Sequence, residues 1–344
     1  MFLLATFTWS RKYFLVFPHA QENLEKYWER VEPTLDEDTI RWWLEQLAGL
    51  VNGLLEIHGS RVPATAGTAP WKEGSGSSIK FKEGEDKFGR HGDIKPQNIL
   101  WFPPSSESDE PRGTLVLADF GLGRFHGKDT RSNVPWDQIK FSPTYEPPEL
   151  KLHRPVSRAY DMWSLACIFL EFATWILKGQ DGITEFAEKR SLSDSVFEEL
   201  SNDEFFSVVG KARSEAEVRE GVTEWVKMLH QDKQCPTFIH NLLDMTMNHL
   251  LVIDQANRYD AFVLNQQFEC FQELARNPDY LVKPKPWATS STTPGTSRSK
   301  QERKPTTHRI SNISTPKTRA QTGGSDIRYS GACSRSRTWP VPPR

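Results

Sequence analysis

The stretch GRHGDIKPQNILWF, residues 89–102, sets an aspartate, a lysine and an asparagine at short intervals ahead of an apolar run. These polar residues are Asp93, Lys95 and Asn98, and the apolar run is typical of a buried strand. A second aspartate, Asp119, opens the tripeptide DFG at the end of the next apolar run, TLVLADFG. An exposed acidic loop separates the two runs, which are therefore predicted to pair as a hairpin.

This spacing favours one kind of chemistry. A carboxylate and an amide oxygen at neighbouring strand ends can share a hard cation, since Mg²⁺ prefers oxygen ligands and keeps water or phosphate in its other positions. Asp93 would then face an acceptor hydroxyl, while Lys95 neutralises the phosphate being transferred. Positioning and charge stabilisation are what phosphoryl transfer requires, with little covalent work by the protein.

The flanking segments are predicted to be mostly helical. Residues 38–59 carry apolar side chains at three- and four-residue steps, which predicts a long amphipathic helix. Residues 158–179 are apolar on nearly every face, which is typical of a helix buried on all sides. Residues 23–31 predict a short helix capped by Asn23, and several amphipathic helices follow to about Ala275.

The N-terminal part predicts strands and a loop. The first residues, MFLLATFTWSRKYFLVF, are apolar, but Arg11 and Lys12 interrupt them and no basic residue precedes them, unlike in a signal peptide. Two short strands are predicted instead, the second of which, 12–17, is expected to be buried. Residues 60–89 are rich in Gly, Ser and charge and predict an inserted flexible loop. The segment GSGSSIKFK within it fits neither phosphate-loop fingerprint.

Four motifs now identify a resemblance. HGDIKPQN, DFG, SPTYEPPE and DMWSLAC are similar, in order and spacing, to the catalytic loop, magnesium loop, activation-segment end and central helix of eukaryotic protein kinases. The resemblance covers roughly residues 3–275, and its type is serine/threonine, as in kinase-like domains of filamentous fungi. It implies an α+β, protein kinase-like fold that is mainly the helical C-lobe, with a remnant of the N-lobe sheet and a disordered C-terminal tail.

The same resemblance implies a domain organisation. Residues 1–280 would form a partial protein kinase domain. Within it, residues 1–22 would be the remnant N-lobe strands and the hinge, and residues 23–280 the C-lobe. Residues 281–344 would form a disordered basic tail rich in Ser, Thr and Pro.

The resemblance also implies roles at the reacting end of the site, with ATP and Mg²⁺ as cofactors. Asp93 would be the catalytic base and Lys95 would contact the γ-phosphate. Asn98 and Asp119 would hold Mg²⁺. Ser142 would tie the substrate loop to Asp93 and Lys95.

Further roles concern nucleotide binding and internal support. The expected adenine contacts are Leu100 beneath the ring and the hinge residues Phe17, Pro18, His19 and Ala20. The expected structural residues are His91, Phe120 and Gly121 beside the loop, Asp161 in the buried helix, and Glu149 paired with Arg258.

Two departures from the family pattern matter. Gly92 stands where most relatives have an arginine that meets a phosphate on the activation segment, so we expect activity independent of phosphorylation there. The family's glycine-rich loop, strand lysine and helix glutamate have no counterpart in the sequence, which begins at Met1 two strands before the hinge. Turnover in the family needs these parts, so the activity of the chain as written is left open, and an incomplete gene model or a degenerate fragment explains their absence most simply.

Two other functions remain open at this stage. A small-molecule phosphotransferase of the aminoglycoside or choline kind also uses HGD with an asparagine five residues later. Lys95, Ser142 and the long activation segment argue against it, because small acceptors need no peptide-docking segment. A non-catalytic, pseudokinase-like interaction module is the other alternative; the Asp93, Asn98 and Asp119 set argues against it, and the missing N-lobe parts argue for it.

The charge along the chain is divided unevenly, which bears on its binding partners. From Leu281 onward the chain has thirteen Lys and Arg against two acidic residues, so the tail carries about +11 and residues 1–280 about −13. The tail is expected to be solvated or to contact its own acidic domain. A protein with Ser/Thr acceptors is the expected substrate, with no nucleic acid or membrane partner. Cysteines without a CxxC pair favour an intracellular, cytoplasmic location, and RSKQERKPTTHR leaves the nucleus open.

Overall fold

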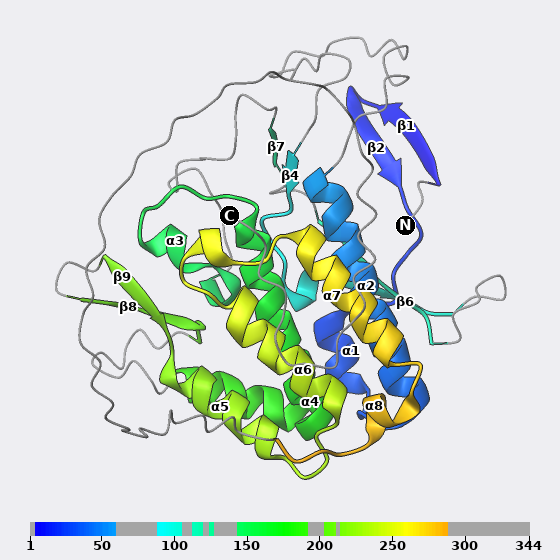
Figure 1. Cartoon of the computed structure of the whole chain (residues 1–344). Coiled ribbons are helices and arrows are strands. Elements are labelled where there is room, and N and C mark those ends of the chain that lie inside the picture. Colours follow the sequence, from blue (N-terminus) through cyan, green and yellow to red (C-terminus); the bar gives the residue numbers. More distant parts are fainter. Residues whose placement is uncertain are drawn as a thin grey trace, which may run out of the picture. The chain divides into compact units, whose positions relative to one another are not determined.

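A computed structural model describes residues 4–59, 88–104, 112–119, 124–126, 143–191, 203–210 and 214–287. Helix α4 runs through the middle of the helical part (Figure 1). The helices are α1 (Leu24–Arg30), α2 (Glu37–Gly59), α3 (Pro148–Lys151), α4 (Ala159–Ser191), α5 (Glu220–Gln231), α6 (Thr237–Met245), α7 (Ala261–Leu274) and α8 (Pro278–Val282).

The strands form four small antiparallel sheets among the described residues: β1–β2, β3–β5–β6, β4–β7 and β8–β9. Their bounds are β1 (Ala5–Trp9), β2 (Lys12–Val16), β3 (Glu22–Asn23), β4 (Phe88–Arg90), β5 (Ile99–Phe102), β6 (Thr114–Leu117), β7 (Arg124–His126), β8 (Phe206–Val209) and β9 (Glu215–Val218).

Helix α4 forms the core, as its sequence predicts. It contacts α1, α5 and α6, and its residues 160–176 are buried without interruption. By length and composition α4 could cross a membrane, but 83% of its apolar window is buried inside the domain. It is therefore a core helix. The prediction ended it at Gly179; that residue is non-helical, with φ 71°, but helix resumes beyond it to Ser191.

Helix α2 is the predicted amphipathic helix, and it supports the β5–β6 hairpin. Gln46 accepts a hydrogen bond from the backbone N–H of Leu115 at 2.8 Å, and Trp42 donates to the carbonyl of Gly113 at 2.8 Å. Gly113 has φ 83°, and a Cβ there would lie 2.2 Å from the carbonyl oxygen of Phe102. Only glycine fits this turn without a shift of the backbone.

Aromatic residues join α1, α2, β5 and α4. Tyr27 lies 5.8 Å from Trp43 and 5.4 Å from Trp101, between ring centroids, and Trp43 lies 5.3 Å from Trp175. Helix α1 begins as predicted, because the side chain of Asn23 accepts from the N–H of Lys26 at 3.0 Å. This cluster fixes the start of α2 and the start of the hairpin relative to α4.

The first two strands were predicted, but the expected burial of the second was wrong. The turn between β1 and β2 has positive φ at Ser10 and Arg11, which matches the twist of a two-residue hairpin. Both strands are exposed, with Trp9 and Tyr13 about 70% accessible. A two-stranded sheet has no second layer of its own to cover an apolar face.

Other boundaries also differ from expectation. Residues 88–89, assigned to the loop, belong to β4 and pair with β7; residues 60–87 lie outside the described part. The β8–β9 hairpin was not predicted. Helix α8 crosses position 280, where the sequence placed the start of the tail, and the described chain continues to Trp287, whose ring stacks on His230 at 4.3 Å. The predicted tail beyond it is not described.

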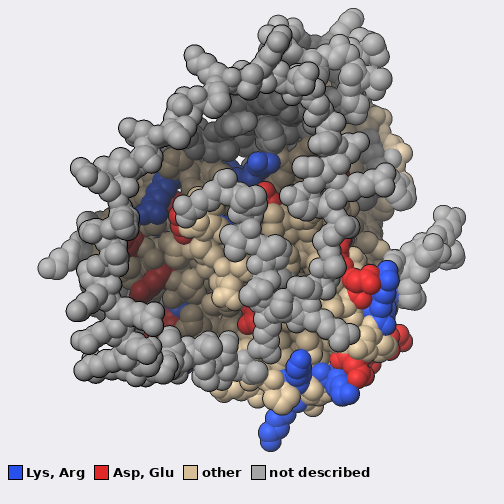
Figure 2. Space-filling model, viewed as in Figure 1, with Lys and Arg blue, Asp and Glu red and all other residues tan. Residues whose placement is uncertain are grey.

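Several charged side chains of the described residues lie beside opposite charges. Figure 2 shows acidic and basic groups adjacent along the lower edge of this face. Helices α7 and α8 contribute exposed pairs: Arg276 lies 2.9 Å from Glu273, and Lys283 lies 2.8 Å from Asp279. Exposed pairs of this kind contribute little to stability because solvent screens them.

Candidate active site

Asp93 lies at the centre of the predicted catalytic loop, and two neighbours fix its carboxylate. Asn98 donates from Nδ2 to Oδ2 and to the backbone carbonyl of Asp93, both at 2.8 Å. Lys95 places Nζ 2.9 Å from the same Oδ2. The three residues that the sequence analysis grouped by spacing therefore form one connected unit. Charge-assisted hydrogen bonds of this length restrict the side chain to one orientation.

Asp161 anchors this loop to the core from helix α4. It is fully buried, and its two carboxylate oxygens accept from the backbone N–H groups of His91 and Gly92, each at 2.8 Å. His58, in the last turn of α2, contacts Asp161 Oδ2 through Nε2 at 2.8 Å. Burial alone raises the pKa of this carboxyl, but the hydrogen bonds from His58 and Gly92 outweigh burial, so its pKa is lowered from 3.8.

Asp119 lies beside Asn98 at the end of the β5–β6 hairpin. The backbone N–H of Ala118 donates to the carbonyl of Asn98 at 2.9 Å, and His91 Nε2 lies 3.0 Å from the carbonyl oxygen of Ala118. The next residue, Asp119, is exposed and has φ 61°, which is uncommon outside glycine. Such backbone strain concentrates at functional sites, where neighbouring contacts hold it.

The donor set at this position suits Mg²⁺. The amide nitrogen of Asn98 is engaged by Asp93, which leaves the amide oxygen as the group available to a cation. Asp119 offers a carboxylate from the adjacent strand end. Amide and carboxylate oxygens are the hard ligands that Mg²⁺ prefers, so the chemistry of these two residues fits the metal that the motifs imply.

The predicted adenine contacts converge on the same hairpin. Leu100 lies in β5, opposite Asn23 of β3 on one side and Val116 of β6 on the other. The predicted hinge, Phe17–Ala20, leads directly into β3, and the N–H of Gln21 donates to the carbonyl of Trp101 at 3.1 Å. The structure therefore brings the hinge beside the strand that carries Leu100.

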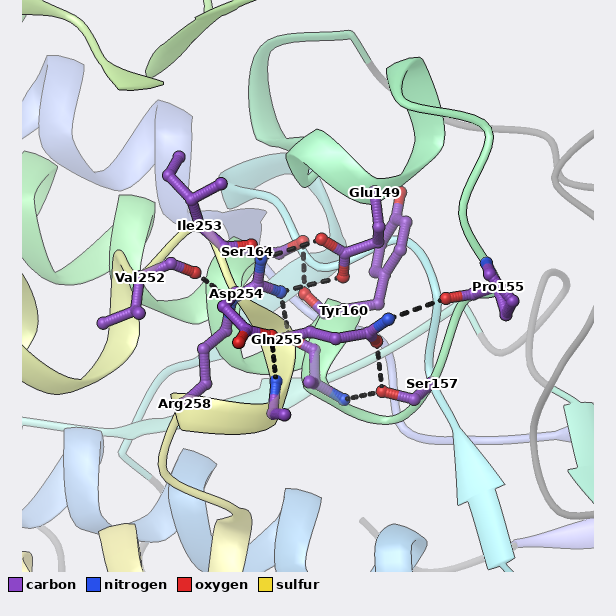
Figure 3. A network of polar contacts seen from close by, with 12 residues as sticks. Glu149, Pro155, Ser157, Tyr160, Ser164, Val252, Ile253, Asp254, Gln255 and Arg258 are labelled. Atoms are coloured by element: carbon purple, nitrogen blue, oxygen red, sulfur yellow. Dashed lines mark hydrogen bonds and ion pairs between the residues drawn. The ribbon is translucent and has the colours of Figure 1, made fainter. Parts of the chain in front are cut away.

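Glu149 and Arg258 form the pair that the motifs implied. Arg258 Nη1 and Nη2 donate to the two carboxylate oxygens of Glu149, both at 2.8 Å, and both side chains are almost fully buried. Figure 3 shows the pair within a network that reaches Ser157 and Gln255. Arg258 also donates to backbone carbonyls, including that of Val252 at 2.6 Å. The start of α3 is thereby fixed to the segment ahead of α7.

The remaining predicted site residues, Phe120, Gly121 and Ser142, lie outside the described residues. His58, in contrast, was not predicted as a site residue from the sequence. A histidine in the last turn of a long helix is usually only a favourable end charge, and nothing local indicates that it reaches a carboxylate that lies 103 positions away.

The fold and the connected loops together define a protein kinase domain. Residues 87–262 match the family model of the protein kinase domain, a span of just over half of the chain. The chain therefore belongs to the protein kinase family and has the kinase-like fold that the motifs implied. As a family, protein kinases use ATP and Mg²⁺ and transfer a phosphoryl group.

Individual relatives are distant. The chain is 28% identical over 216 residues to cyclin-dependent kinase-like 5 of Mus musculus and 29% identical over 216 residues to that of Homo sapiens. Each alignment covers 59% of this chain and 20% of the relative, so the chain spans about a fifth of their length. The crystal structure of the yeast RNA Pol II CTD kinase CTDK-1 complex aligns with TM-score 0.44 and 18% identity, over 83% of this chain and 76% of that one.

Proposed function

We propose that this chain is a serine/threonine protein kinase that transfers the γ-phosphate of ATP to hydroxyl groups of proteins. The observation that carries the proposal is the orientation of Asp93, held by Asn98 and Lys95 within 3 Å. A base must be held at the hydroxyl before it can accept the proton. Similarity to cyclin-dependent kinase-like relatives supports a protein acceptor over a small molecule.

In this proposal each residue has one task. Asp93 accepts the proton of the attacking hydroxyl, and Lys95 neutralises charge on the phosphate in transfer. Asn98 both orients Asp93 and, with Asp119, would hold Mg²⁺. Bound Mg²⁺ would supply charge neutralisation on the phosphates. Asp161 acts indirectly, because it fixes the backbone of the loop that carries Asp93.

The test separates nucleotide binding from phosphoryl transfer. The full chain is assayed for a thermal shift with ATP and Mg²⁺ and for phosphorylation of a generic basic protein, followed by identification of the modified residue. We expect phosphoserine or phosphothreonine. Asp93→Asn should reduce kcat by about 10²- to 10⁴-fold, the usual contribution of a general base, and should keep the thermal shift.

Two further variants complete the design. Asp119→Ala should abolish both the Mg²⁺-dependent shift and the transfer, whereas Asp279→Asn, on an exposed pair in α8, should change neither. A thermal shift without any phosphorylation by the wild-type chain would favour an interaction module. Phosphorylation of an aminoglycoside or choline instead of protein would favour a small-molecule phosphotransferase.

A further inference from the structure

The β8–β9 hairpin lies next to helix α3 (Figure 1). Helix α3 closes residues 143–151, which correspond to the predicted end of the activation segment and are called the docking segment below. Its base is firmly held. The guanidinium of Arg190, at the end of α4, lies 4.2 Å from the ring centroids of both Phe186 and Phe205. Arg219 donates to the carbonyls of Phe206 and Arg190 at 3.1 and 3.2 Å. The hairpin base is therefore a fixed extension of α4.

Two consecutive acidic residues at this base contact the docking segment. Asp203 accepts from the hydroxyl of Thr144 at 2.6 Å, and Glu204 forms an ion pair with Lys151. Each carboxylate also faces an arginine of the base: Asp203 lies 3.4 Å from Arg190, and Glu204 lies 3.7 Å from the second arginine, Arg219. The pair Asp203–Glu204 thus bridges α4 and the hairpin to both ends of residues 144–151.

A buried glutamate of the docking segment faces the same pair. Glu146 is 1% exposed, and Lys151 Nζ lies 3.8 Å from its Oε1, while its Oε2 has no hydrogen-bond partner among the described residues. The charged and titratable groups that act on it are Lys151 of α3, Glu204 of the hairpin base and Tyr160 of α4. Glu146 and Glu204 both lie beside Lys151, so this arrangement favours protonation of one of the two carboxyl groups.

We propose that Asp203 and Glu204 are positioning residues that hold residues 143–151 in the conformation that docks a protein substrate. This inference rests on the proposed kinase function. A carboxylate pair supplied by the hairpin fixes both ends of the segment within the chain itself. An added phosphate can order such a segment where an arginine is present to bind it. Here Gly92 stands in place of that arginine, and the fixed charges of Asp203 and Glu204 would order the segment instead.

Backbone amide hydrogen exchange of the full chain tests the contact without reference to activity. Asp203→Ala together with Glu204→Ala should accelerate exchange in residues 143–152 by about ten-fold or more, as expected when charge-assisted hydrogen bonds are lost. Exchange in α2 should stay unchanged. The matched control is Glu217→Ala, an exposed acidic residue on β9 of the same hairpin. Unchanged exchange in residues 143–152 of the double variant would overturn the proposal.

Conservative variants guard against simple unfolding. Asp203→Asn and Glu204→Gln keep an acceptor for Thr144 and Lys151 but lose the charge, so they should show a smaller acceleration in the same peptide. Acceleration throughout the domain in these conservative variants, rather than in the segment, would contradict a positioning role.

Kinetics then connect the contact to substrate. The KM for the protein substrate should rise by about ten-fold in Asp203→Ala, whereas the KM for ATP should stay within error, because uniform loss of substrate binding raises KM alone. An equal rise in both values would count against the inference. If the wild-type chain transfers no phosphate, the proposed function fails, while hydrogen exchange still decides whether Asp203 and Glu204 hold the segment.

Discussion

Arg258 binds both carboxylate oxygens of Glu149 at 2.8 Å across 109 positions of sequence, and both side chains are almost fully buried. The pair joins the end of the docking segment to the loop ahead of α7. Arg258 also donates to the carbonyl of Ala159, the first residue of α4. One side chain therefore connects three segments that the sequence keeps far apart, and its removal should affect all of them.

Loss of either partner should be strongly destabilising. Arg258→Ala leaves the Glu149 carboxylate buried without its cation, and breaking a buried pair in this way costs about 3–5 kcal/mol. The free energy of unfolding, from chemical denaturation, should fall by that amount. Glu149→Gln with Arg258→Met should recover part of the loss, because no unpaired charge remains.

The control is the exposed pair at the C-terminal end of α7. Arg276→Ala removes the solvent-exposed contact with Glu273, which should leave the free energy of unfolding unchanged within error. If Arg258→Ala were as mild as Arg276→Ala, the buried pair would contribute nothing and the three segments would be held by other contacts.

Asp161 should prove equally sensitive. Asp161→Asn replaces an acceptor with an amide, so at least one of the donors from His58, His91 and Gly92 loses its partner. A buried donor left unsatisfied costs about 1–3 kcal/mol, and the loop carrying Asp93 should become mobile. His58→Ala should lose less, since the two backbone donors keep their bonds. Equal losses from the two variants would indicate that His58 is the main anchor.

Some of this architecture could be predicted from local sequence. Helices α2 and α4 have their own apolar patterns, because each must bury a stripe or a whole surface wherever it packs. The unit of Asp93, Lys95 and Asn98 is also local, since the six consecutive residues 93–98 hold all three groups. For these elements the sequence carries enough information without knowledge of their neighbours.

Other features depend on partners distant in sequence. Nothing near His58 indicates that it contacts Asp161. The β8–β9 hairpin was missed because its strands have four residues each and β9 is half glutamate, which has low strand propensity. The exposure of β2 was missed because KYFLVF is apolar. Whether an apolar strand is buried depends on other elements that cover it, and its own sequence does not show these.

The contribution of two buried carboxyl groups, Glu146 and Glu171, to stability should decline as pH rises from 4.5 toward 8. Burial and the nearby Glu204 carboxylate raise the pKa of Glu146 from 4.5 to about 8, and burial raises that of Glu171 to about 7. Between these limits the folded chain binds protons that the unfolded chain releases, so unfolding becomes easier as pH increases.

Glu146→Gln isolates the first of these two groups. Its amide needs no proton, so the stability of this variant relative to wild type should increase by up to about 1.4 kcal/mol per pH unit across that window. Urea denaturation at several pH values measures this difference, and Glu171→Gln measures the contribution of the other carboxyl. A wild-type minus Glu146→Gln difference that is constant from pH 5 to 8 would show that Glu146 is ionised throughout.

Kinase activity should not require phosphorylation of the activation segment. At Gly92 the chain offers a backbone N–H, which donates to Asp161 at 2.8 Å, and no guanidinium for a phosphate to bind. Phosphatase treatment of the purified full chain, with complete removal of phosphate checked by intact mass, should leave the rate of substrate phosphorylation unchanged within error.

The variant Gly92→Arg cannot replace this test, because Gly92 has φ 82°, which strains any L side chain. A large loss of rate after dephosphorylation would mean that another cationic side chain binds a phosphate on this segment. Lys151, which contacts Glu146, would be the first residue to substitute.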